Sequence, residues 1–404
     1  MPDAPATAGG LLDHLRAGRA RTRADLQRLS GLSRTAVGAR LAALEEAGLI
    51  EEGHEQAPTG GRPAGALRFR ADAGVVLAVA IGRSRSQLAV FDLVGRELAG
   101  DTRDHEVGVG AEELMPLVVE RLRAMVAPID LPIAGVGISL PGVVDERRRV
   151  SVDSPVMGGW DGVELVPFLR TLTDAPVFLA NDADTMARAE LFSGTPYRDL
   201  LVVKASTGLG MGVVADGRVL TGGLGAAGEI GHTRIGAGDL PCRCGAAGCL
   251  ESVAGGWALV NAFNDSGRTA GHVRDLVAMA LAGDSVARNL LRESGRELGE
   301  VLAVAINLLN PEAVVLGGDM GAAFEVYAAG VRESVYARST ALATRDLQFL
   351  PAAHGDSAGL IGCAALALDH VLAPAAVDER LSSPDPRFSG GPARLASADR
   401  HPVG

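Results

Sequence analysis

The chain has 404 residues, 47% of them hydrophobic and 22% charged, which is enough for a large core and two or three domains. Its N-terminus lacks the features of a signal peptide, and no apolar run reaches the roughly eighteen residues of a membrane span, so we expect a cytoplasmic protein. The net charge of −11 argues against a chain coated in nucleic acid, but the charge is uneven: residues 1–72 carry ten Arg against nine Asp and Glu, and the remainder carries −12.

The first part of the chain has the pattern of a DNA-binding module. Apolar residues at helical spacing predict three short helices, at residues 10–16, 23–29 and 34–47. Ser33 is placed to cap the third helix. A strand then starts near Ile50, Gly60–Pro63 resembles a hairpin tip, and 66–69 alternates like a returning strand. Helix, helix, turn, helix and hairpin predict a winged helix-turn-helix over residues 1–72.

In such a module the third helix enters the major groove and the wing contacts the backbone or the minor groove. A winged helix used for protein contacts is the alternative. Residues 13–40 carry seven Arg against two Asp, which favours double-stranded DNA. The residues that we expect to contact an operator are Ser33, Arg34, Thr35, Gly38 and Arg40 on the third helix and Arg62 in the wing.

From Gly74 onward, short β-runs alternate with helical segments. Two strand pairs, each followed by α/β units, predict a duplicated α/β architecture with a cleft between two lobes, at about 73–195 and 196–372. The segment 373–404 is rich in Pro, Ser, Asp and Arg and lacks periodicity, which predicts a disordered tail. The expected strands are 76–81, 88–91, 133–139, 177–180, 200–203, 212–214 and 313–317.

One imidazole and three thiols lie within eighteen residues: His232, Cys242, Cys244 and Cys249. Tetrahedral Cys3His is a closed structural zinc set, and the glycines and proline between the ligands allow a tight loop. A set of free, reduced cysteines is the alternative, which three thiols within eight residues disfavour. We therefore expect structural Zn²⁺ in a loop spanning 229–251.

Polar residues follow the predicted strand 177–180 and flank the metal loop. Asn181 and Asp182 open a helix, Glu229 precedes His232, and Glu251 follows Cys249 closely. For any one of these acids alone, an exposed surface role is the simpler interpretation. Because the metal loop draws Glu229 and Glu251 together, we expect a group of carboxylates with an amide, which suits a polyhydroxylated ligand.

Together these motifs resemble the ROK family of bacterial sugar kinases and sugar-responsive repressors, over about residues 10–370. The N-terminal module resembles that of the repressor branch. The resemblance implies a two-lobe, actin-like or hexokinase-type (ribonuclease H-like) ATPase fold, and sugar contacts from Asn181, Asp182, Glu229, His232 and Glu251. The matching segments are Gly135–Asp145, Asn181–Ala183, Glu229–His232, the Cys242/Cys244/Cys249–Glu251 signature and Asn310–Gly318.

The nucleotide side departs from the family's kinases. Their Asp-x-Gly-Gly-Thr loop, whose Asp helps to hold Mg²⁺ and phosphate, is replaced by Ala80-Ile81-Gly82-Arg83-Ser84, and Ser206 stands at a usual Gly of the second loop. Phosphoryl transfer depends on positioning and charge neutralisation by these parts. The resemblance makes Asp182 the kinase base, so we expect it to be vestigial and expect no catalytic residue.

Three hypotheses follow. The first is a homodimeric or homotetrameric repressor of carbohydrate genes, whose operator affinity changes when sugar binds the cleft. The second is an active, glucokinase-like sugar kinase with an added DNA-binding arm, which the intact Asp182 keeps open. The third is a sensor of sugar phosphates, with Arg83 pairing the phosphate.

Overall fold

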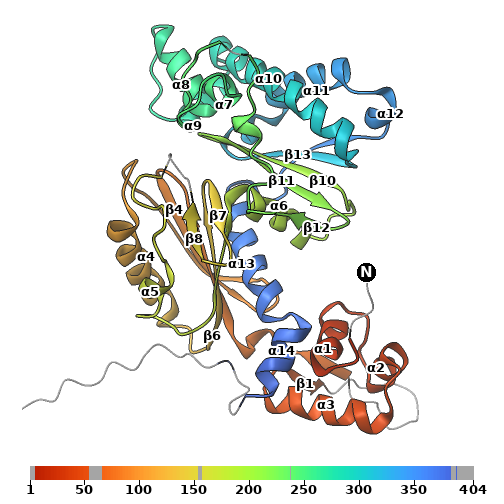
Figure 1. Ribbon diagram of the computed structural model, residues 1–404. Coiled ribbons are helices and arrows are strands. Elements are labelled where there is room, and N and C mark those ends of the chain that lie inside the picture. The colour runs from red at the N-terminus through yellow and green to blue at the C-terminus, as the bar shows by residue number, and fades with distance from the viewer. Residues whose placement is uncertain (1–4, 54–65, 153–156, 237, 384–387, 389–404) are drawn as a thin grey trace, which may run out of the picture.

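The computed structural model describes residues 5–53, 66–152, 157–236, 238–383 and 388. The N-terminal module contains three helices and a two-stranded antiparallel hairpin, in which Ile50 pairs with Phe69 (Figure 1). Leu11, Leu12 and Leu41 are buried between the helices. The predicted winged helix-turn-helix is therefore confirmed, although residues 54–65 lie outside the described structure. Its elements are α1 (Ala8–Arg16), α2 (Arg23–Ser30), α3 (Arg34–Glu46), β1 (Ile50–Gly53) and β2 (Ala66–Phe69).

The first lobe is built on a five-stranded sheet with the order β5-β4-β3-β6-β9. Its strands β3 and β6 read as nearly continuous apolar runs because both faces are covered. The amphipathic helix α4 covers one face, with Leu114, Val118 and Leu122 in the core. The elements are β3 (Val75–Ile81), β4 (Arg85–Asp92), β5 (Glu97–Asp104), α4 (Ala111–Val126), β6 (Ile133–Leu140), the hairpin β7 (Val143–Asp145) and β8 (Val150–Val152), α5 (Val166–Leu169) and β9 (Val177–Asn181).

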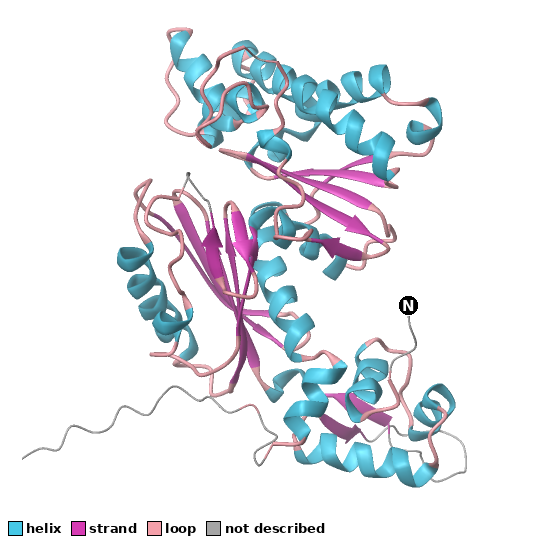
Figure 2. Ribbon diagram, viewed as in Figure 1, coloured by secondary structure: helices cyan, strands magenta, loops and turns pink. Residues whose placement is uncertain are grey.

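The second lobe repeats the same topology, with the order β12-β11-β10-β13-β14. In each sheet the first three strands in the chain are antiparallel neighbours, and the last two join in parallel. The predicted duplication is thus confirmed, and helices pack on both sheets (Figure 2). The elements are β10 (Leu200–Ala205), β11 (Leu209–Ala215), β12 (Arg218–Leu220), α7 (Glu251–Ala254), α8 (Gly256–Asp265), α9 (Val273–Leu281), α10 (Ser285–Leu309), β13 (Ala313–Gly317), α11 (Phe324–Arg338), α12 (Ala341–Thr344) and β14 (Gln348–Pro351).

Two helices each follow the sheet of one lobe in the sequence but pack on the sheet of the other lobe. Helix α6 (Asp182–Phe192) follows the last strand of the first sheet but packs on β10 and β11 of the second. Helix α13 (Ala358–Val371) follows the last strand of the second sheet but packs on β3 and β6 of the first. A Cβ at Gly137 would meet the Cys363 carbonyl oxygen at 2.0 Å, so this glycine permits the close packing of β6 and α13. A single lobe boundary near residue 195 is therefore too simple.

Helix α13 leads directly into α14 (Pro374–Leu381), which packs against α1 of the DNA-binding module (Figure 1). The Gly9 amide donates a 2.8 Å hydrogen bond to Asp378 Oδ1, and Val377 is buried. The expected disordered tail from residue 373 is thus wrong over α14, because α14 is ordered by packing against α1 of the distant N-terminal module and against α13. Residues 384–387 and 389–404 lie outside the described structure.

Among the described helices, no single one is long and apolar enough to cross a membrane. One bent pair, Gly355–Val371 with Pro374–Leu381, meets that length and composition together, with a 54° angle at the break. Most residues of α13 are buried in the protein core.

Candidate functional site

A cleft between the lobes brings together all five residues that the sequence predicted for sugar contact: Asn181, Asp182, Glu229, His232 and Glu251. The same cleft is lined by the turn after β3 and by the loop between β10 and β11. The cleft lies at the carboxyl ends of β3, β9 and β10, and open α/β sheets bind their ligands at such strand ends.

At the start of α6, Asn181 acts as a helix cap and also contacts the turn between β6 and β7. Its Oδ1 accepts hydrogen bonds from the amides of Ala183 and Asp184, at 2.7 and 3.3 Å, and its Nδ2 donates to the Gly142 carbonyl oxygen at 2.8 Å. The cap fixes the first turn of α6 and therefore the Asp182 carboxylate that follows. That carboxylate faces the cleft with 17% of its side chain exposed.

Lys204 is a residue of this site that the sequence reasoning missed. Its Nζ lies 2.9 Å from Asp182 Oδ2. Burial lowers the pKa of Lys204, but the Asp182 carboxylate raises it, and the net shift is upward. The sequence signal was available: Lys204 is the only lysine of the chain, and it follows the apolar strand residues 200–203 directly. The ion pair occupies one oxygen of the carboxylate that a kinase would use as its base.

Glu251 is the most firmly held acid of the cleft. It is 5% exposed, and its Oε2 accepts a 3.0 Å hydrogen bond from the Leu209 amide, while Oε1 accepts from Trp257 Nε1 at 3.2 Å. A Cβ at Gly208 would meet Oε2 at 2.6 Å, so the glycine lets the carboxylate reach the loop backbone. Glu251 thus connects the metal loop to the loop between β10 and β11.

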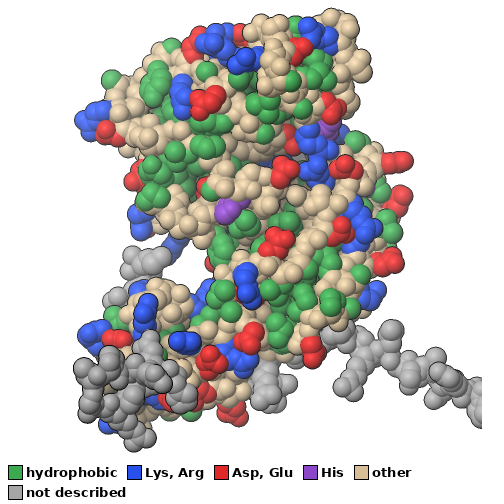
Figure 3. All heavy atoms as spheres, turned by 180° about the vertical axis from the view of Figure 1, so that it is seen from behind, with side chains coloured by type: hydrophobic (Ala, Val, Ile, Leu, Met, Phe, Trp, Pro, Cys, Tyr) green, Lys and Arg blue, Asp and Glu red, His purple; other side chains and the backbone are tan. Residues whose placement is uncertain are grey.

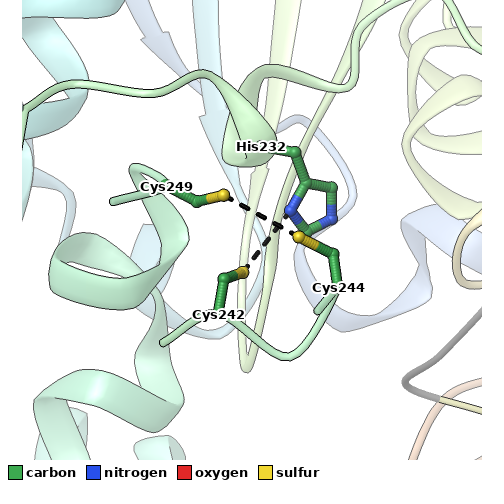
Figure 4. A group of neighbouring side chains, drawn as sticks. All are labelled: His232, Cys242, Cys244 and Cys249. Carbon is green, nitrogen blue, oxygen red and sulfur yellow. Dashed lines mark hydrogen bonds between the residues drawn. The ribbon is translucent and has the colours of Figure 1, made fainter. Parts of the chain in front are cut away.

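The four predicted metal ligands converge (Figure 4). Their ligand atoms lie within 4.8 Å of one another. The sulfurs of Cys244 and Cys249 are 3.8 Å apart, and Cys242 Sγ lies 3.7 Å from His232 Nδ1. Ligands at about 2.3 Å from a tetrahedral ion stand about 3.8 Å apart, so the donor set and spacing fit a metal ion.

His232 joins the metal cluster to the cleft. Its Nδ1 faces the sulfurs, whereas its Nε2 lies 3.9 Å from Glu229 Oε2. Burial raises the pKa of Glu229, and His232 opposes that shift. A Cβ at Gly228 would meet the Met211 carbonyl oxygen at 1.6 Å, so the glycine allows this segment to lie against β11. A metal ion on Nδ1 would fix the imidazole and thereby the position of Nε2.

The other half of the cleft holds the loops that would face a nucleotide. Ala80 lines it with a methyl group, and Arg83 projects from the turn that follows β3. Burial lowers the pKa of Arg83, and Glu251 opposes the shift. Ser206 Oγ accepts a 3.0 Å hydrogen bond from the Asp319 amide, so its hydroxyl joins two loops.

In the DNA-binding module the predicted contact residues are not equivalent. Ser33, Arg34 and Thr35 are exposed at the start of α3, and Ser33 Oγ caps the helix by accepting from the Ala36 amide at 3.2 Å. Arg34 forms no ion pair with any residue that the structure describes.

Arg40 and Gly38 are less available than the first turn of α3. Both are half-buried. Arg40 donates to the carbonyl oxygens of Ala6 and Ala36, each at 3.1 Å. Arg62 lies outside the described residues. On the face that Figure 3 shows, acidic and basic side chains are interspersed over the lobes.

The chain belongs to the ROK family, whose profile matches residues 76–370. A xylose repressor of Caldicellulosiruptor bescii is 26% identical over 347 residues, covering 81% of this chain and 86% of the repressor. An N-acetylmannosamine kinase of Citrobacter koseri is 33% identical over 292 residues, covering 70% of this chain and 98% of the kinase. A solved ROK family transcriptional regulator, a homologue of the E. coli MLC protein, has a TM-score of 0.77 at 26% identity and covers 93% of this chain and 98% of its own.

Proposed function

We propose that this protein is a sugar-responsive transcriptional repressor that binds operator DNA through residues 1–72 and a sugar through the cleft of residues 73–372. The observation that carries the proposal is the added module: a winged helix-turn-helix packs on α14, which continues α13 from the cleft. The relatives support it, since the repressor and regulator cover more of this chain than the kinase does.

In this proposal α3 enters the major groove with Arg34, Thr35 and Ser33 at its leading end. Gly38 would allow close approach of the DNA, and Arg40 would have to leave the carbonyl oxygens that it contacts. Arg62 of the wing would contact a phosphate or the minor groove. A homodimer or homotetramer would place two such helices on a symmetric operator, and the protein would act in the cytoplasm, where it reaches the chromosome.

On the sugar side, Asn181, Asp182, Glu229, His232 and Glu251 would hold the hydroxyl groups. We propose that the ion on His232, Cys242, Cys244 and Cys249 is zinc, with a structural role, because three thiolates and an imidazole close its tetrahedral shell. When bound, the ion would fix the loop that carries Glu229 and Glu251.

We further propose that the protein is not an enzyme. Ala80 offers no ligand for Mg²⁺, and the ion pair with Lys204 occupies one oxygen of Asp182, the residue that would act as the base. The second candidate is an active, glucokinase-like kinase, which the intact Asp182 and the 33% identity to a sugar kinase favour. ATP-dependent phosphorylation of any sugar at turnover numbers of about 1 s⁻¹, the low end of ordinary enzymes, would establish that candidate instead.

The experiment is selection of bound fragments from a random double-stranded DNA pool with the full chain, followed by fluorescence anisotropy on the winning sequence. The Arg34→Ala variant should weaken binding about tenfold or more, because a bidentate Arg–base contact contributes about 1–3 kcal/mol. The control Arg288→Ala removes an exposed cation of α10 and should change nothing. Equal affinity of all three proteins, or no selected sequence, would contradict the assignment.

A further inference from the structure

The cations that line the cleft fall into two groups. Lys204 pairs with Asp182, Arg85 with Asp104 and Asp356, and Arg274 with Asp104. Arg83 and Arg243 line the same cleft, but neither forms an ion pair with a residue in the described part of the chain. A partly buried guanidinium without an ion-pair partner is costly, so these two side chains need another explanation.

Arg243 is held in place by the metal loop. It lies between the ligands Cys242 and Cys244, and its guanidinium stacks over the Trp257 ring at 4.6 Å from the centroid. Trp257 in turn donates to Glu251 Oε1. The planar group is therefore positioned beside the sugar half of the cleft, with its donors still available.

Arg83 approaches from the opposite lobe. It lies in the turn between β3 and β4, and its Nε is buried without a hydrogen-bond partner. Arg243 lines the same cleft from the second lobe. An anion bound in this cleft would satisfy the orphaned Nε donor of Arg83 and balance the charge of both side chains.

We propose that Arg83 and Arg243 form an anion site for the phosphate of a phosphorylated monosaccharide whose ring lies against Asp182 and Glu251. The inference rests on the proposed sugar-binding function and names the chemical class of the effector. A guanidinium pair suits the three oxygens of a phosphate monoester. Arg243 connects the site to the sugar half, because the Trp257 ring on which it stacks donates to Glu251 Oε1. A nucleotide would need Mg²⁺, for which Ala80 supplies no ligand.

This arrangement would also couple ligand to lobe position. Arg83 belongs to the first lobe and Arg243 to the second, so a phosphate bridging them would favour one interlobe separation over others. A ligand shifts such an equilibrium only by its differential affinity for the two states. A neutral sugar lacks this bridge, and we expect it to affect operator binding less than its phosphate ester.

The test is isothermal titration calorimetry of the zinc-loaded full chain with glucose, mannose, N-acetylglucosamine and xylose, each beside its phosphate monoester, and with inorganic phosphate and ATP. At least one ester should bind tenfold or more tightly than its parent sugar. Arg83→Gln and Arg243→Gln should each abolish that preference and leave the parent sugar's affinity within twofold. Arg83→Lys should restore part of it, and the remote Arg288→Gln should have no effect.

Zinc content checks each variant, because Arg243 lies in the metal loop; if Arg243→Gln loses the metal, Arg83→Gln decides. Esters no tighter than their parents, or equal loss of both forms in the variants, would overturn the anion site and leave the sugar-responsive function intact. Inorganic phosphate or ATP binding as tightly as the best ester would also overturn it, since the sugar would then contribute nothing. Failure of every sugar and ester to bind would refute the proposed function itself.

Discussion

The two halves of the cleft differ in how their polar groups are held. On the sugar half, Asn181 caps α6, Glu251 accepts from a backbone amide and an indole, and His232 joins the metal cluster. On the other half, Ala80 offers only a methyl group, and Arg83 has a buried nitrogen without a partner.

The polar residues of the sugar half are thus tied more closely to the fold than those of the other half. The sugar-half residues also serve the fold, since the cap, the loop contact and the metal ligand all stabilise elements beyond the site. Replacing one of them costs stability as well as binding. Ala80, by contrast, contributes only a methyl group that packs in a hydrophobic core.

The largest expected effect comes from breaking the metal cluster. Cys249→Ser should remove the ion and abolish measurable sugar binding, because structural zinc contributes about 10–16 kcal/mol to ordering such a loop. Glu229 and Glu251 would then lose their fixed positions. Metal content by mass spectrometry and sugar affinity by calorimetry are the measurements.

The matched control is Cys363→Ala, which removes a buried thiol outside the cluster, one that contacts the Val79 carbonyl oxygen. It should retain the metal and the sugar affinity. A Cys249→Ser variant that lacks the metal but binds sugar normally would show that the sugar half does not depend on the cluster.

The next effect is smaller and concerns Glu251 alone. Glu251→Gln keeps the shape but turns one end of the group into a donor, so either Leu209 N or Trp257 Nε1 loses its acceptor. Together with the loss of a charge-assisted bond to the ligand, this should weaken sugar binding about 100-fold. The exposed Glu120→Gln on α4 is the control. Unchanged calorimetric affinity would remove Glu251 from the binding set.

The metal cluster and most of the secondary structure could be predicted from the sequence. The spacing of His232, Cys242, Cys244 and Cys249 predicted the cluster that the structure brings together, because tetrahedral coordination requires short, flexible connections. The strand pairs and the three N-terminal helices were predicted to within a few residues. Local periodicity decides such elements.

What could not be predicted depends on contacts between distant segments. The pairing of Lys204 with Asp182, the stacking of Arg243 on Trp257 and the order of α14 all arise in the folded chain. The packing of α6 and α13 on the sheet of the other lobe has the same cause, since the sequence of a helix does not reveal which of two sheets it covers. The outer strands β5, β12 and β14 were missed because their residues are largely exposed and lack a clear alternation.

The smallest expected effect concerns Asp184, a buried carboxyl in the first turn of α6, two residues after Asp182. Asp184 is 3% exposed, its Oδ1 has no hydrogen-bond partner, and burial raises the pKa of its carboxyl from 3.8 to about 7. Because the folded form binds the proton more tightly than the unfolded form does, its stability falls as the pH rises from about 4 through 7 and is level above that. Asp184→Asn removes this penalty. The variant should therefore be stabilised about 2 kcal/mol more at pH 8 than at pH 5, which corresponds to a difference of about 4 °C in the gain of melting temperature. Thermal unfolding of both proteins at the two pH values measures it, and an equal gain at both would show that Asp184 ionises freely in the folded protein.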